Sequence, residues 1–61
     1  MDLQQRIEIH LRRSGMKAAR FGRDVMGDPR FVFDLRKGRE MRPPTAARVS
    51  TWLDRQQEER A

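Results

Sequence analysis

Hydrophobic residues recur at helical spacing from the first residues of the chain onward. Leu3, Ile7 and Leu11 follow one another in steps of four, which places them along one face of an amphipathic helix. Asp2 stands where an N-cap is expected, and a Ser-Gly pair ends the periodic run. The pattern therefore predicts a first helix over about residues 2 to 13.

A second and a third helix are predicted on either side of a glycine-containing turn. Residues 17–26 read as a short amphipathic helix. The tripeptide Gly27-Asp28-Pro29 then combines a residue for a tight turn, an N-cap and a proline suited to the first helical position. A third helix is therefore expected over residues 29–37. The residues expected to point inward from these two helices are Phe21, Val25, Val32 and Leu35.

The last periodic segment follows a basic loop over residues 39–43. Two prolines there are suited to the start of a helix, and apolar or amide side chains follow at helical spacing. This helix is therefore expected over residues 44–58. Its inward residues are Val49, Trp52, Leu53 and Gln56. Because no segment alternates like a strand, the expected fold class is all-α, with four short helices in one domain over residues 1–58. Residues 59–61 are expected to form a frayed tail.

Charge adds a candidate partner to this picture. Fourteen Lys and Arg residues stand against nine Asp and Glu, which gives a formal net charge of +5 in 61 residues. Such an imbalance favours a nucleic acid as the partner. Charge alone leaves open the alternative that the arginines serve only solubility.

Several other kinds of function are not expected. The chain has no cysteine and one histidine, which excludes a disulfide framework and an ordinary Cys/His zinc site. Ser14, Ser50 and His10 form no nucleophile or acid-base constellation, and no glycine-rich phosphate loop is present. We therefore expect a protein that is not an enzyme and that has no catalytic residue, metal or cofactor.

No membrane segment is expected either. The first residues carry charges throughout, and no apolar run is longer than residues 31–33. We expect a cytoplasmic protein without a membrane partner, associated with the nucleoid when it binds DNA.

Residues 15–38 as a whole describe a helix, a turn and a second short helix. This segment resembles, without a gap, the helix-turn-helix of the lambda-repressor and Cro type of bacterial and phage regulators. The residues that carry the resemblance are Gly15, Met16, Phe21, Gly22, Val25, Val32, Leu35 and Gly38. The resemblance implies a lambda-repressor-like domain whose third helix enters the major groove of double-stranded DNA.

The resemblance also implies which side chains meet the bases. The candidates are Arg30, Phe31, Phe33, Asp34 and Lys37. Arginine suits guanine, phenylalanine can meet a thymine methyl group, and aspartate can accept from cytosine. For Asp34 the alternative is an ion pair with Arg30 four residues earlier. Phe31 and Phe33 cannot both face inward, and Phe31 is expected to be the one nearer DNA; a core that wraps further round the helix is the alternative.

Further cations at helix ends and in loops are expected to contact phosphates, which position a protein without reading sequence. They are Lys17, Arg20, Arg23, Arg36, Arg39 and Arg42. For each of them the alternative is an ordinary solvated charge.

The sequence thus predicts a small transcription regulator that binds operator DNA as a homodimer, since one subunit would contact only half a site. Ile9 and the outer face of residues 44–58 are the candidate dimer surfaces. One alternative is a protein-binding adaptor, antitoxin-like or associated with a polymerase or a phage, which would depend on Ile9 and Phe31. Another is a non-specific architectural nucleic-acid binder that acts through net charge.

Overall fold

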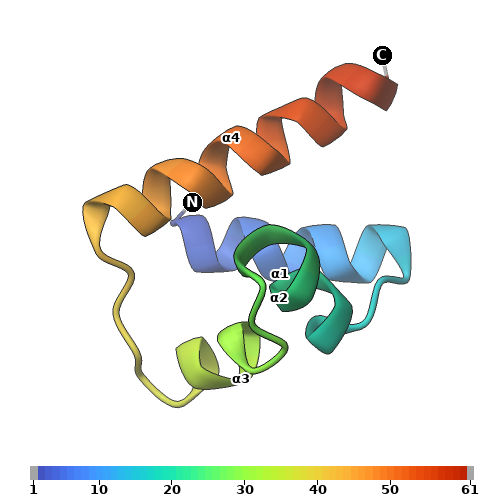
Figure 1. Cartoon of the computed structure of the whole chain (residues 1–61). Helices are drawn as coiled ribbons and strands as arrows, with labels where there is room; N and C mark the ends of the chain where they lie inside the picture. The colour runs from blue at the N-terminus through green and yellow to red at the C-terminus, as the bar shows by residue number, and fades with distance from the viewer. Residues whose placement is uncertain (1, 61) are drawn as a thin grey trace.

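The computed structural model describes residues 2–60, and the side chains of residues 2–57, as four helices without a strand. The helices are α1 (Leu3–Ser14), α2 (Ala18–Met26), α3 (Phe31–Arg36) and α4 (Pro43–Arg60). In Figure 1, α4 runs along the top, α1 and α2 lie below it, and α3 lies at the lower edge. The prediction of an all-α fold with four helices is confirmed.

Helix α1 begins and ends as its sequence predicts. The backbone N–H of Gln5 donates to Oδ1 of Asp2 at 2.8 Å, and the N–H of Asp2 donates to the Gln5 side chain at 3.0 Å, so the two residues form a capping box. Gly15 ends the helix with a φ of 72°, a left-handed conformation that glycine adopts without strain.

Helix α3 is shorter than its predicted range of 29–37. Pro29 and Arg30 form a turn, in which the N–H of Phe31 donates to the backbone carbonyl of Asp28 at 3.1 Å. Oδ1 of Asp28 accepts from the N–H of Arg30 at 3.0 Å. Asp28 therefore caps this turn, as expected of its position, but the α-helix itself starts two residues after Pro29.

Helix α4 is longer than predicted at both ends. It starts at Pro43, because a proline has no N–H to leave unpaired in the first turn of a helix. It continues to Arg60, beyond the expected end at Glu58, so the expected frayed tail is helical as far as the structure describes it. Ala61 lies outside the described residues.

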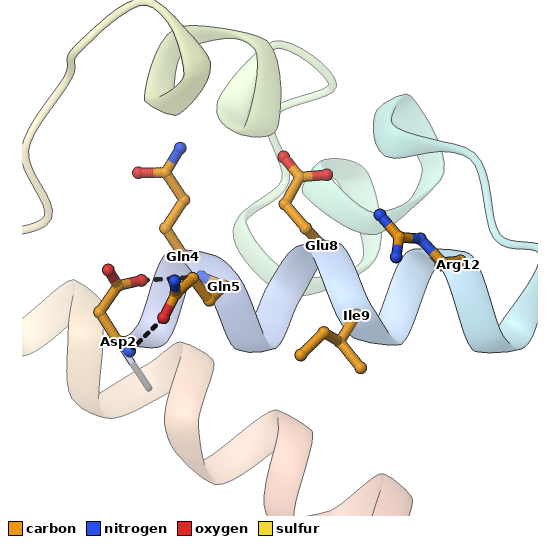
Figure 2. A pocket seen from close by; sticks show the side chains of 6 residues that line it. All are labelled: Asp2, Gln4, Gln5, Glu8, Ile9 and Arg12. Atoms are coloured by element: carbon orange, nitrogen blue, oxygen red, sulfur yellow. Dashed lines mark hydrogen bonds between the residues drawn. The ribbon is translucent and has the colours of Figure 1, made fainter.

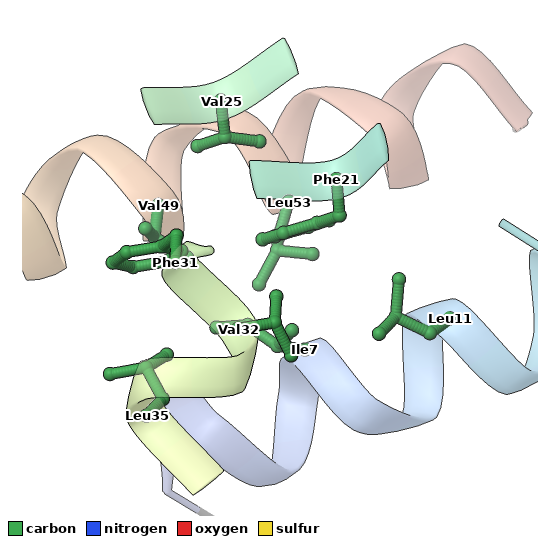
Figure 3. Packing of buried hydrophobic residues seen from close by; sticks show 9 residues of the cluster. All are labelled: Ile7, Leu11, Phe21, Val25, Phe31, Val32, Leu35, Val49 and Leu53. Carbon is green, nitrogen blue, oxygen red and sulfur yellow. The ribbon is translucent and has the colours of Figure 1, made fainter. Parts of the chain in front are cut away.

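The helices enclose a small apolar core drawn from all four of them (Figure 3). Its buried residues are Ile7, Leu11, Phe21, Val25, Phe31, Val32, Leu35, Val49 and Leu53. Eight of the nine are inward-facing in the sequence pattern, and Phe31 is the exception. Phe31 is 1% exposed and belongs to the same core cluster as Val49 of α4, so the expectation that Phe31 is the exposed one of the two phenylalanines, and hence the one nearer DNA, does not fit its burial. The buried face of α3 is therefore wider than the stripe of Val32 and Leu35 that the sequence predicts.

Trp52 is half-buried at the edge of this core and joins three helices. Its ring meets His10 of α1 edge-on, with centroids 5.3 Å apart, and meets Phe21 of α2 at 5.1 Å. Such tilted aromatic pairs stabilise a fold beyond the area they bury. A second tie between α1 and α4 is the ion pair of Arg6 with Asp54, at 2.8 Å.

The approach of α2 to the turn before α3 depends on Gly22. A Cβ atom built on Gly22 would overlap the backbone carbonyl oxygen of Asp28 and lie 3.1 Å from Cβ of Phe31. The N–H of Asp28 in turn donates to the carbonyl of Gly22 at 3.1 Å. Backbone therefore packs directly on backbone at this point, which only glycine permits.

Replacing Gly22 by Ala should destabilise the protein. Alanine favours a helix over glycine by about 1 kcal/mol, but displacing the backbone of Asp28 outweighs this gain. We expect a net loss of about 1–3 kcal/mol in the free energy of unfolding, measured by urea denaturation. Ala47→Ser, which adds one atom at an exposed position of α4, should change it by less than about 0.5 kcal/mol. Equal stability of Gly22→Ala and wild type would contradict this account.

Candidate nucleic-acid interface

One face of α3 and of the turns beside it points away from the core. At about 100° per residue, Arg30, Phe33, Asp34 and Lys37 fall within roughly 100° of one another, opposite the buried residues of α3. The helical geometry extends to both ends, since Arg30 and Lys37 have αR backbone conformations. We call these four residues the outer face of α3. Four of the five predicted base-contact residues lie on it, and the fifth, Phe31, is in the core.

Phe33 is the exposed aromatic residue of the outer face. Its exposed fraction is 42%, and it is the one large hydrophobic residue that is exposed among the described side chains. The expectation that one of the two phenylalanines is exposed is therefore confirmed, with Phe33 in place of Phe31.

The two cations of the outer face are available to a partner. Arg30 and Lys37 are both exposed, and neither forms an ion pair with another described side chain. The alternative of a pair between Arg30 and Asp34 is not what the structure has. Asp34 instead pairs with Arg39, at 3.4 Å.

Arg39 holds two carboxylates beside the outer face. Besides Asp34 it pairs with Asp28 at 3.6 Å, and its guanidinium carbon lies 5.6 Å from the centre of the Phe31 ring. Arg39 thus neutralises the carboxylates of Asp34 on α3 and of Asp28 in the preceding turn, and it packs on the ring of Phe31. Its charge is shared with these two acids, which makes it a weaker candidate for a phosphate contact than the sequence predicts.

Arg36 is also engaged within the protein. Its Nε donates to Oε2 of Glu8 and its Nη2 to Oε1, both at 2.8 Å, so the pair is bidentate. One turn before Glu8 on α1, the Gln4 side chain donates to the backbone carbonyl of Leu35 at 3.4 Å. Figure 2 shows Gln4 and Glu8 on the same side of α1, the side that faces α3.

The electrostatics of this pair follow its geometry. The hydrogen bonds from Arg36 hold the pKa of the Glu8 carboxyl below its ordinary value of 4.5, against the opposing effect of partial burial. The same hydrogen bonds raise the pKa of Arg36. Both groups are therefore charged at neutral pH.

The other predicted phosphate contacts lie at the ends of α2 and in the loop before α4. Lys17, Arg23 and Arg42 are exposed and form no ion pair with a described side chain. Arg20 is exposed as well and lies 3.5 Å from Asp24 on the same helix, a loose pair in open solvent. These cations remain available to an anionic partner.

Several hollows lie elsewhere on the described surface. A shallow hollow of about 410 Å³ runs along α1 (Figure 2), lined by Asp2, Gln4, Gln5, Glu8, Ile9 and Arg12. Among the described residues, no group of three His, Cys, Asp or Glu side chains could hold a metal ion. No described helix is long and apolar enough to cross a membrane.

Sequence reasoning missed the part that α1 plays at this interface. Glu8 contacts a residue 28 positions later, and Gln4 one 31 positions later. No local pattern links residues so far apart in the chain. Their positions on α1, next to but not on the apolar stripe, are the one available signal that they face a neighbouring helix.

Comparison with known proteins identifies no relative. No protein-family model, curated protein or solved structure was found to match this chain. Its function is therefore argued from the geometry above.

The pair of Glu8 and Arg36 should make the stability depend on pH. Both side chains are more than a third exposed, so Glu8→Gln should lower the free energy of unfolding by about 1 kcal/mol or less at pH 7. Because the folded pKa of Glu8 is depressed, its contribution is complete above 4.5, the ordinary value, and is lost as the pH falls through the folded pKa. Wild type and variant should thus converge in acid.

Urea denaturation of both proteins at a series of pH values measures this convergence. Glu40→Gln is the matched control, because Glu40 is exposed and has no ion pair with a described side chain. A difference between wild type and Glu8→Gln that persists unchanged in acid would refute the assigned role of the ion pair.

Proposed function

We propose that this protein binds double-stranded DNA sequence-specifically and regulates transcription, with α3 in the major groove. In this proposal α2, the turn and α3 are a helix-turn-helix of the lambda-repressor and Cro type. A B-DNA major groove is about 12 Å wide and accepts one α-helix, whose outward side chains then reach the base edges. The outer face of α3 supplies such side chains.

The observation that carries the proposal is Phe33 between Arg30 and Lys37. An aromatic ring 42% exposed to water in so small a protein loses little by leaving water and gains contact with an apolar partner. The flanking cations favour a partner that is anionic. DNA combines thymine methyl groups and guanine acceptors in its groove with phosphates on either side.

The geometry changes which residues are assigned to each role. We assign base contacts to Arg30, Phe33 and Lys37, whereas Asp34 is held by Arg39. Phosphate contacts are assigned to the exposed cations Lys17, Arg20, Arg23 and Arg42. Arg36 and Arg39 are left out because carboxylates of the protein already hold them.

A six-residue helix reads few base pairs, so a homodimer is part of the proposal. Two copies on half-sites about one helical turn apart would double the contacts. The structure supports the adaptor alternative less than the sequence does. It depends on exposed apolar residues such as Ile9 and Phe31, of which Phe31 is in the core and Ile9 is half-buried. The exposed Phe33 could serve a protein partner as well as DNA.

Selection from a random pool of double-stranded DNA tests the proposal directly. At about physiological salt, the purified protein should enrich a palindrome with half-sites about 10 bp apart. A pool that binds but stays random would favour the architectural alternative. The absence of binding would overturn the proposal and leave the adaptor alternative.

Two arginine variants distinguish contacts to the bases from contacts to the phosphates. Arg30→Ala should cost about 1–3 kcal/mol of binding free energy on the selected site and relax the preference at one base pair. Arg23→Ala should weaken binding to all sequences alike and reduce the slope of log affinity against log salt by about 1. Fluorescence anisotropy on the selected site and on a scrambled duplex measures both effects. Identical behaviour of the two variants would contradict the assignment.

A further inference from the structure

Helix α3 is held by apolar contacts along its length and, at its C-terminal end, by polar contacts as well. At its start, Phe31 is buried and its Cβ lies close to the backbone of Gly22 on α2. At its end, Leu35 is buried in the core, and two polar ties to α1 are added: the hydrogen bond from Gln4 to the Leu35 carbonyl and the bidentate pair of Glu8 with Arg36. A helix of six residues has little stability of its own, so these contacts decide how it lies.

The bidentate pair constrains more than one distance. Two parallel hydrogen bonds of 2.8 Å fix the plane of the Arg36 guanidinium as well as its position. The guanidinium carbon lies 5.7 Å from the centre of the Phe33 ring, within the range of a cation–π contact. Glu8, Arg36 and Phe33 therefore form a continuous chain of contacts from α1 to the outer face of α3. We call it the Glu8–Arg36–Phe33 chain.

We infer that Glu8 is a positioning residue for sequence recognition: through Arg36 it fixes the direction of α3 and the place of the Phe33 ring, and thereby sets how strongly the protein discriminates between DNA sequences. This inference rests on the proposed function. Glu8 itself is negatively charged, so it contributes nothing favourable to a contact with phosphates.

The rival interpretation gives Arg36 to a DNA phosphate, as the sequence suggests. Glu8 would then compete with DNA for Arg36, and removing its charge would strengthen binding. The two interpretations thus predict different results from the same variant. The decisive quantity is the ratio of affinities for the selected site and for a scrambled duplex, which a uniform gain or loss of binding leaves unchanged.

Glu8→Gln and the control Glu40→Gln each remove one negative charge. Both should bind the scrambled duplex at least as tightly as wild type, because the net charge of the protein rises. Glu8→Gln alone should lower the affinity ratio, by about fivefold, because the end of α3 and the Phe33 ring are less firmly fixed. An unchanged ratio in Glu8→Gln, or an equal fall in Glu40→Gln, would overturn the inference.

Arg36→Lys gives a second test at constant charge. Lysine cannot form two parallel hydrogen bonds with a carboxylate, but it can still contact a phosphate. We expect a similar fall in the affinity ratio, with the salt dependence of wild type retained. An affinity ratio equal to that of wild type in Arg36→Lys would favour the phosphate interpretation. As a control, thermal unfolding of each variant shows whether it is folded under the conditions of the binding measurement.

A measurement without DNA separates the inference from the proposed function. In Glu8→Gln, the amide protons of Asp34 to Lys37 should exchange with solvent faster than in wild type, and by a larger factor than those of α2 and α4, which change only as far as the free energy of global unfolding falls. An equal acceleration in all helices would count against the inference. If wild type itself shows no sequence preference, the proposed function and the inference both fail. If wild type discriminates and Glu8→Gln discriminates equally, the inference alone fails.

Discussion

The contact of Gly22 with the backbone of Asp28 is the constraint on which the rest of the structure depends. It brings α2 and the turn so close together that Phe31 lies in the core cluster. With Phe31 inward, the opposite side of α3 is necessarily the side that carries Phe33. The close approach of two backbones thus determines which side chains of α3 the protein presents to solvent.

Electrostatics divides the many arginines of the chain into two groups. Arg6, Arg36 and Arg39 are bound to carboxylates of other elements or of the neighbouring turn, and they hold helices and loops together. Arg30 and the exposed cations of α2 have no such tertiary partner among the described residues, and they give the proposed interface its charge. The net positive charge of the chain therefore overstates the number of basic side chains that are available to a partner.

The sequence predicts the helices and most of the core because both depend on local periodicity and capping. It does not predict the burial of Phe31, because the spacing of apolar residues does not determine how far round a helix the buried face extends. It also assigns Arg36 and Arg39 to DNA, because nothing local reveals that Glu8 and Asp28 reach them. Residues whose contacts depend on distant parts of the chain are those for which sequence reasoning is incomplete.

The separation of the two sides of α3 has a consequence for how such a protein changes over evolution. Arg30 and Lys37 are exposed and form no ion pair with a described side chain, so most substitutions there change the stability of the fold little. If α3 reads DNA as proposed, descendants of this chain can acquire new sequence preferences at these two positions one mutation at a time. Phe33 is less free to vary, because a replacement also removes the surface on which Arg36 rests.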